Sequence, residues 1–177
     1  MTSDVISLIT QDHREVEALF ERLRSGQGDQ AATAAELHAL LTAHSRAEED
    51  RVYPQLDAHH GVEEHKEAEV LLDSLVRAEP GSAEFRQTLQ QLEDAVTHHV
   101  KEEEDELLPQ LTESATPERL RELGQAFKQR RDEELRALTV TGETKAELYE
   151  QAQRADIPGR SRMDKQELRD ALRQAGT

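Results

Sequence analysis

Apolar residues recur every three or four positions along most of the chain, which is the period of an amphipathic helix. This spacing predicts a helix over residues 4–24, which ends where Gly26 and Gly28 interrupt the pattern. It predicts a second helix over residues 31–57. Pro54 should kink or end that helix, because proline lacks the backbone N–H donor.

Two further helices follow from the same spacing. Gly61 is expected to mark the turn before the third helix, which begins near Val62 and stops before Pro80. The fourth helix begins near Phe85, and Pro109 should repeat the kink caused by the earlier proline. The first four helices are therefore joined by short connections, which favours antiparallel neighbours.

A fifth helix is predicted after Thr116, which has the character of an N-cap, with Pro117 in the first turn. The residues Leu123, Phe127 and Arg131 lie roughly on one side of it. We therefore expect an all-α fold. It should consist of an antiparallel, up-and-down four-helix bundle with a fifth helix and a small C-terminal helical hairpin.

One stretch of the second predicted helix recurs in the fourth. His44–Leu56 and His99–Leu111 are identical at seven of thirteen positions, including the histidine, the glutamate four residues later and the proline. Residues four apart lie on the same face of a helix. In both copies an imidazole and a carboxylate therefore project the same way, from an apolar stripe that must face inward.

The segments that precede the two copies also match each other. Asp12–Phe20 and Glu64–Leu72 both read acid, histidine, base, glutamate, apolar, glutamate, apolar, leucine, apolar. One His-x3-Glu on a surface helix carries little information, but four segments that match in the same order are hard to obtain by chance. The candidate metal ligands are His13, His44, Glu48, His65, His99 and Glu103.

Buried imidazoles and carboxylates need a partner. Without one, each would cost several kcal/mol, and metal coordination removes that cost. A mixture of nitrogen and oxygen ligands suits a borderline metal such as iron. Six inward ligands exceed the four of a closed zinc site, which favours two ions, with zinc or manganese as the alternative metals.

Composition narrows the function further. The chain has no cysteine, which excludes disulfides, thiolate metal sites and cysteine nucleophiles. Its formal net charge of −16 opposes bulk binding to nucleic acid or anionic lipid. There is no apolar run of about eighteen residues and no signal-like N-terminus, so we expect a cytoplasmic protein that does not contact a membrane.

The histidines, the two His-x3-Glu pairs and the two helix-end prolines resemble the hemerythrin-like family of HHE cation-binding domains over residues 4–112. The resemblance implies two iron ions with an oxo or hydroxo bridge inside the bundle. It also implies that Glu48 and Glu103 bridge the ions and that the histidines are terminal ligands. Two octahedral ions need about twelve ligand positions. Four histidines, two carboxylates that bridge both ions and one oxo or hydroxo bridge would fill about ten of them, and about two would stay open.

The chain departs from one pattern within that family. Members that carry oxygen reversibly place two histidines one turn apart on the third helix, whereas this chain has Glu69 four residues after His65. The difference favours acting on or sensing oxygen, peroxide or nitric oxide over simple carriage, and leaves open a peroxide- or oxygen-reducing activity. An iron- or redox-responsive regulator and a purely structural bundle are the other two functions considered.

Several polar residues near the apolar stripe are placed outside the predicted ligand set. Glu17 and Glu69 are expected to be solvated, with acceptance of an imidazole N–H as the alternative. Tyr53 is interpreted as a packing residue, and Glu104 either supports the site or pairs with a base. His59 and His60 are expected in or near a loop, from which His60 could approach the site. The histidines expected off the ligand face are His38 and His98.

The charge balance changes after Gly142. Residues 1–142 carry 15 basic and 31 acidic side chains, whereas residues 143–177 carry seven of each. We therefore predict a bundle domain over 1–142 and a small module over 143–177, with short helices near 145–155 and 165–175.

The stretch that runs from Lys145-Ala146-Glu147-Leu148-Tyr149 through Ile157-Pro158-Gly159 to Leu168 is similar to the helix-extended-loop-helix module of transcription terminator Rho. The resemblance implies a contact with nucleic acid or protein that is limited to residues 143–177. A small docking or solubilising unit is the alternative.

Overall fold

The computed structural model describes residues 3–56, 58–142, 145–155, 157–160, 163, 167–168 and 171–172. The described residues are helical wherever they form regular structure, and none of them is in a strand. The all-α prediction is therefore confirmed. The helices follow one another as α1 to α7, with two short irregular turns between them.

Helices α1 (Val5–Ser25) and α2 (Gln30–Arg51) form the first helix pair. Each begins at an aspartate that accepts a backbone N–H: Asp4 from Ser7 at 2.8 Å and Asp29 from Ala32 at 3.0 Å. Gly26 ends α1 with a φ of 65°, in the left-handed region that glycine adopts without strain. The sequence thus sets the start of both helices and the end of the first.

Helices α3 (His59–Arg77) and α4 (Ala83–Glu102) form the second pair, and Ser82 caps α4 by accepting from the N–H of Phe85. The predicted turn at Gly61 is wrong, because α3 already begins at His59. For the same reason His60 lies on a helix and not in a loop.

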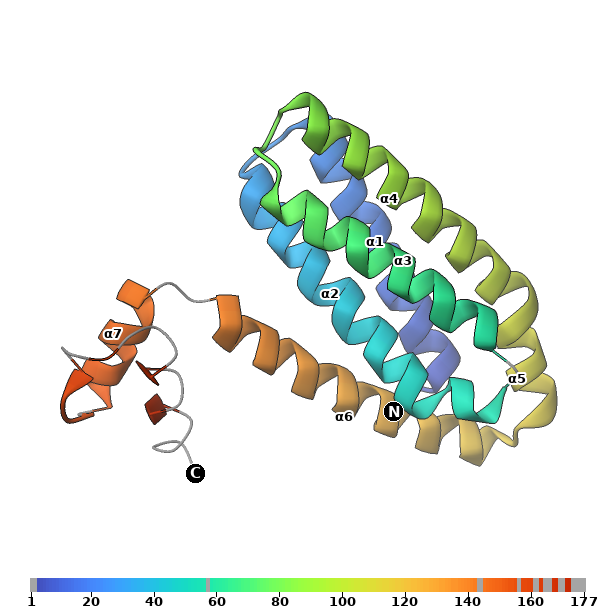
Figure 1. The fold of residues 1–177 in the computed structure, drawn as a ribbon. Coiled ribbons are helices and arrows are strands. Elements are labelled where there is room, and N and C mark those ends of the chain that lie inside the picture. Colours follow the sequence, from blue (N-terminus) through green and yellow to red (C-terminus); the bar gives the residue numbers. More distant parts are fainter. Residues whose placement is uncertain are drawn as a thin grey trace. The chain divides into compact units, whose positions relative to one another are not determined.

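The four helices lie side by side and alternate in direction, with connections at opposite ends of the bundle (Figure 1). This is the predicted up-and-down arrangement, since each short connection returns the chain antiparallel to the helix before it.

Both predicted proline interruptions are present, but they differ. After α2 the chain tightens into a 3-10 turn, Tyr53–Gln55, with Pro54 at its start. After α4 the chain widens into a π-helical turn, Glu103–Leu107, which leads into α5 (Leu108–Ser114) with Pro109 in its first turn. Single π turns inside helices are frequent at functional sites.

Helix α6 (Pro117–Gly142) begins after α5 and packs against the first helix pair with its N-terminal half. Leu123 and Phe127 are buried there together with Val5 and Ile9 of α1. Gly124 is required at this contact, because a Cβ would come within 2.7 Å of the Ser3 carbonyl oxygen.

Two apolar clusters fill the bundle, one at each end. On α1, the first contains Val16 to Leu23 and the second contains Val5 and Ile9. Between them the same face of α1 buries Asp12 and His13. A polar layer therefore divides the apolar core, and it needs internal partners to offset its desolvation.

The chain divides into two compact units, residues 1–135 and residues 136–177. In the second, α7 (Lys145–Arg154) agrees with the predicted helix near 145–155. Its small core contains Leu148, Ala152, Ile157 and Leu168. Most of the helix predicted near 165–175 lies outside the described residues.

In the part of the chain that the structure describes, no helix combines the length and apolar character needed to cross a lipid bilayer.

Candidate metal centre

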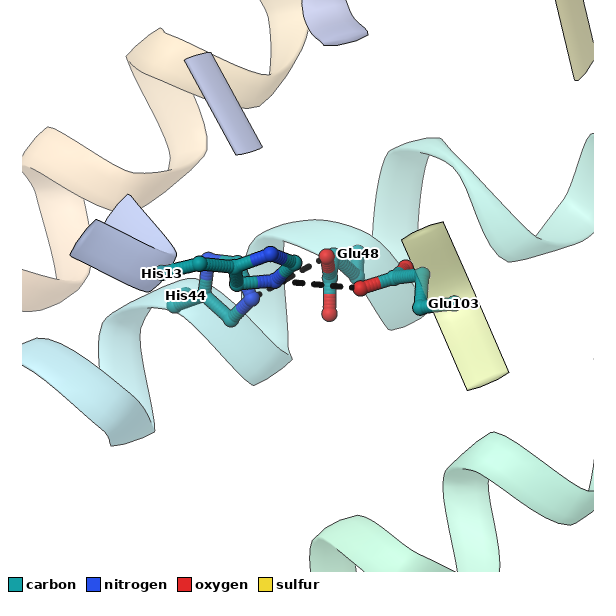
Figure 2. Close-up of side chains that lie close together, drawn as sticks. All are labelled: His13, His44, Glu48 and Glu103. Carbon is teal, nitrogen blue, oxygen red and sulfur yellow. Dashed lines mark ion pairs between the residues drawn. The ribbon is translucent and has the colours of Figure 1, made fainter. Parts of the chain in front are cut away.

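The polar layer of the bundle brings all six predicted ligands together. They are His13 from α1, His44 and Glu48 from α2, His65 from α3, His99 from α4 and Glu103 from the π-helical turn. Two groups of side chains offer donor atoms that lie within 4.8 Å of one another. The first group is His13, His44, Glu48 and Glu103 (Figure 2), and the second is Glu48, His65 and His99. All six side chains are buried.

Glu48 belongs to both groups. Its Oε1 lies 3.1 Å from Nε2 of His44, and its Oε2 lies 3.3 Å from Nε2 of His65. Glu103 is placed less evenly, with Oε2 at 3.2 Å from Nε2 of His13 and 3.9 Å from Nε2 of His99. The inward atoms of the histidines are thus the Nε2 atoms, and they surround the two carboxylates.

The outer nitrogen of each of these histidines faces a carboxylate. Nδ1 of His13 donates to Glu104 at 2.8 Å, and Nδ1 of His44 donates to Asp12 at 3.2 Å. In the second half the matching pairs are His65 with Glu49 at 3.1 Å and His99 with Glu64 at 2.8 Å. A carboxylate on Nδ1 holds the imidazole in the tautomer that leaves Nε2 free to bind a metal.

These four carboxylates were not among the predicted site residues, although the sequence contains a signal for them. An acid directly precedes His13 and His65, and a glutamate directly follows Glu48 and Glu103. Each acid reaches a histidine on a different helix, so spacing along one helix does not reveal the contact. Of this set, only Glu104 was expected to support the site or pair with a base, and it does both, since it also accepts from Arg14.

Helix α6 covers the first half of the site. Arg131 donates to Asp12 at 2.7 Å, so Asp12 sits between a guanidinium and the imidazole of His44. The ring of Phe127 packs edge-on against His44 with 5.8 Å between ring centroids. The polar residue Arg131 thus lies on the inner side of α6 because it neutralises a buried carboxylate.

The interpretation of Tyr53 as a packing residue alone is wrong. Its hydroxyl lies 3.3 Å from Nε2 of His65 and 3.5 Å from Oε2 of Glu48, and its ring stacks on His65. Helical spacing misplaced it because the chain has already left α2 at this point. Gly61 lets α3 approach closely, since a Cβ there would lie 2.9 Å from the Tyr53 hydroxyl.

Burial and neighbouring charges shift the pKa values of the histidines and glutamates in the polar layer. Burial lowers the pKa of His44, but Glu48 and Asp12 outweigh it and raise the pKa to about 10. Burial also lowers the pKa of His65, and Glu48 with Glu49 raises it to about 9. Burial and the charge of Glu48 together raise the pKa of Glu103. The negative charge of Glu48 therefore disfavours ionisation of the Glu103 carboxyl inside the buried layer.

Several buried polar atoms in this layer have no hydrogen bond of acceptable geometry. They are Nε2 of His13, Oε1 of Glu48 and both carboxylate oxygens of Glu103. Buried polar atoms are rarely left in this way unless an ion, a ligand or a strained site accounts for them. All four point into the polar layer, so this donor set fits one or more cations.

A cavity of about 40 Å³ adjoins the site. All four histidines of the site line it, together with apolar side chains that include Val16, Leu72, Val96 and Val100. Neither Glu48 nor Glu103 is part of its lining. The charged residues Arg46, Glu49, Glu64 and Glu69 also line it, and a second cavity of about 280 Å³ reaches His13 from another side.

The remaining candidates lie outside the layer. Glu17 and Glu69 are exposed and pair with Arg14 and Arg46, respectively. His60 is also exposed, and its Nε2 approaches Glu64 and Glu102 without joining either buried group. The expectation that Glu17 and Glu69 are solvated is therefore confirmed.

Most of the chain matches one family of known proteins. The model of the Hemerythrin HHE cation binding domain matches residues 4–111, which is more than half of the chain and contains all six buried candidates. The chain belongs to this family. The family assignment supports a cation site in the bundle, in agreement with the buried histidines and glutamates of the HHE domain.

A curated relative of the HHE protein is a "DNA nickase" from Nostoc sp. (strain PCC 7120 / SAG 25.82 / UTEX 2576), with 28% identity over 134 residues. The match covers 71% of the present chain but only 38% of the relative. No solved structure matches the chain. The resemblance of residues 143–177 to the Rho module stays a prediction.

Proposed function

We propose that this HHE domain binds two iron ions between its four helices and acts on or senses oxygen, peroxide or nitric oxide. The observation that carries the proposal is the pair of overlapping donor groups that share Glu48. A carboxylate with one oxygen near His44 and the other near His65 is suited to bridge two ions.

The donor set supports iron over the alternatives. Four imidazole nitrogens and two carboxylates are a borderline ligand set that suits octahedral iron, whereas a closed zinc site needs only four ligands. Manganese prefers oxygen ligands more strongly, and zinc prefers fewer ligands. Metal analysis of the purified protein distinguishes the three metals.

The size of the cavity supports a small ligand. A water molecule needs about 10–15 Å³ of such space, so about 40 Å³ accommodates a molecule of two or three heavy atoms. The apolar side chains in its lining, such as Leu72, Val96 and Val100, suit contact with an uncharged diatomic molecule such as oxygen or nitric oxide.

When bound, iron would supply one-electron chemistry toward these ligands. The chain's own residues prepare the site for it. The four carboxylates on the Nδ1 atoms orient the imidazoles, and the hydroxyl of Tyr53 holds a proton next to His65 and Glu48. Helix α6 excludes water from the His44 side through Phe127.

Iron analysis and absorption spectroscopy of the purified protein test the proposal. We expect about two iron ions per chain and a charge-transfer band from an oxo-bridged pair. His99→Ala should remove the band and lower the iron content, whereas His38→Ala, which changes a histidine outside the layer, should preserve both. A folded protein that takes up no iron, or equal iron in both variants, would contradict the proposal.

Autoxidation separates reactivity from simple carriage. We expect the reduced, iron-loaded protein to be oxidised by air within minutes, because the chain lacks the second histidine of the carriers on α3. An oxygenated form that is stable for hours would show that the protein carries oxygen.

The named relative motivates a second candidate, in which iron or redox state regulates a contact with nucleic acid. We infer that such a contact would be limited to residues 143–177, because the bundle carries the whole net charge of −16. The relative is called a DNA nickase, and this chain spans 38% of it. A gel-shift assay of the full chain at low salt, with and without iron, tests this. The absence of a shift in both states would exclude it.

A further inference from the structure

The surface above His99 carries two more His-x3-Glu pairs. On α3, Nε2 of His60 lies 3.6 Å from Oε1 of Glu64. On α4, Nε2 of His98 lies 3.2 Å from Oε1 of Glu102. The spacing of four residues places each pair on one side of its helix, as in the buried pairs.

The two pairs also meet across the helices. Nε2 of His98 lies 3.9 Å from Oε1 of Glu64, and Nε2 of His60 lies 3.8 Å from Oε2 of Glu102. The donor atoms of His60, Glu64 and Glu102 all lie within 4.8 Å of one another. In a tetrahedral site with bonds of about 2.1 Å, neighbouring ligand atoms are roughly 3.4 Å apart. The imidazole–carboxylate separations of 3.2–3.9 Å are close to this value. His98 is not part of the group within 4.8 Å, so its exposed side chain would turn toward the other three to complete a set of four.

The first half of the bundle shows what the corresponding place contains when α6 covers it. In the alignment of the two halves, Asp12 corresponds to Glu64, and Leu8, Ala43 and Ala47 correspond to His60, His98 and Glu102. Asp12 receives the guanidinium of Arg131 at 2.7 Å. The first half thus combines apolar residues with a cation from the chain, where the second half has two imidazoles and a carboxylate around Glu64.

Glu64 connects this surface to the buried layer. Its Oε2 accepts from Nδ1 of His99 at 2.8 Å, while its Oε1 faces His60 and His98. Its side chain is only 15% exposed, whereas those of His60 and His98 are more than 60% exposed. One oxygen of Glu64 therefore serves the interior and the other faces the surface cluster.

We propose that His60, Glu64, His98 and Glu102 form an outer site for a single divalent transition-metal ion. The ion occupies the position that Arg131 fills in the first half, and two nitrogen and two oxygen ligands suit zinc or ferrous iron. The proposal does not depend on which metal the buried layer holds, because the outer ligands share no donor atom with it.

Calorimetric titration of zinc into the full-length protein, purified with its native metal content, tests the outer site. The wild type is compared with a His60→Gln/His98→Gln double variant, which keeps all six buried side chains. Zinc uptake by the buried layer is then the same in both proteins and cancels. We expect the wild type to bind one more zinc ion than the double variant. Glu102→Gln alone should lower the affinity for that ion by more than about tenfold. Even a residue that only hydrogen-bonds to a metal ligand contributes about tenfold or more to metal affinity.

His38→Gln is the matched control. His38 also lies near one carboxylate, with its Nε2 3.4 Å from Asp73, but it is outside the cluster. Its zinc binding should equal that of the wild type. Equal zinc binding by the wild type and the double variant would overturn the proposal, as would an equal loss in His38→Gln. Low iron content in every variant would contradict the buried iron centre while leaving this comparison intact.

Discussion

The two halves of the bundle supply the same ligand pattern but differ in what surrounds it. In the first half, α6 covers the site, Phe127 packs on His44 and Arg131 neutralises Asp12. In the second half the equivalent carboxylate, Glu64, approaches the surface beside two exposed histidines. The repeated set of histidines and glutamates therefore has one side covered by α6 and one side that lies near the surface.

The irregular turns after α2 and α4 differ in the same way. The 3-10 turn brings Tyr53 onto His65 and Glu48, whereas its counterpart in the repeat, Leu108, belongs to the apolar cluster. The hydroxyl therefore lies beside His65 of one donor group and beside Glu48, which both groups share. The surroundings of the two donor groups therefore differ in proton supply even though their histidines match.

The largest expected effect comes from the carboxylate that both groups share. Glu48→Ala should reduce iron from about two ions per chain to almost none. Glu103→Ala should have a smaller effect, because Glu103 belongs only to the group of His13 and His44. Elemental analysis of the purified variants measures both, with Glu69→Ala as the exposed control. One full iron ion retained in Glu48→Ala would show that the groups are independent.

Removal of the outer carboxylates should separate the closed half from the open half. Asp12→Ala leaves the buried imidazole of His44 without the carboxylate on its Nδ1 and leaves Arg131 with the more exposed Glu15, at a cost of about 3 kcal/mol in the free energy of unfolding. Glu64→Ala should cost about 1 kcal/mol, because its partners are closer to solvent. Urea unfolding of both variants tests this, with Glu36→Ala as the control, because Glu36 is an exposed carboxylate that pairs with Arg22. Equal losses would mean that α6 adds nothing to the first half.

The pH dependence of the metal-free protein should also differ between the halves. The pKa values of His44 (about 10) and His65 (about 9) exceed the unfolded value of about 6.5. Their stabilising contribution is thus complete below pH 6.5 and is lost as the pH rises through 9 and then 10. We expect chelator-treated protein to become less stable over this range, with His65 titrating before His44 by NMR.

Metal binding should reverse this trend. Bound imidazoles must be deprotonated, so metal affinity should increase with pH over the same interval and protons should be released on binding. Unfolding at pH 6.5, 8 and 9.5, with and without iron, compares the two forms. A metal-free protein whose stability is constant from pH 6.5 to 10 would show that these histidines are neutral.

A further expected effect concerns the contact between Gly61 and Tyr53, which only the second half has. Gly61→Ala should cost about 1–3 kcal/mol, because the new methyl group would lie 2.9 Å from the Tyr53 hydroxyl. The same change in a Tyr53→Phe background should cost less, since the hydroxyl is gone. Thermal unfolding of the four proteins gives the coupling between the two positions. Additive effects would mean that the close approach does not constrain Tyr53.

The sequence was informative where chemistry follows the helical period. Histidines and glutamates four residues apart within an apolar stripe predicted the six buried residues that the fold brings together. Spacing could not reveal Asp12 or Glu64, because each supports a histidine on another helix. Tyr53 was misread because the α-helical angle was continued through a 3-10 turn. Gly61 was read as a turn, whereas its role is to bring α3 close to a ring.

The guanidinium of Arg131 has a consequence for how this protein can be divided. The segment that matches the family ends at residue 111, some twenty positions before that arginine. A fragment cut at this limit would contain every proposed ligand yet leave the buried carboxylate of Asp12 without its guanidinium partner. The smallest piece that can be expected to fold and load metal normally therefore extends beyond the conserved-domain boundary, through the first half of α6.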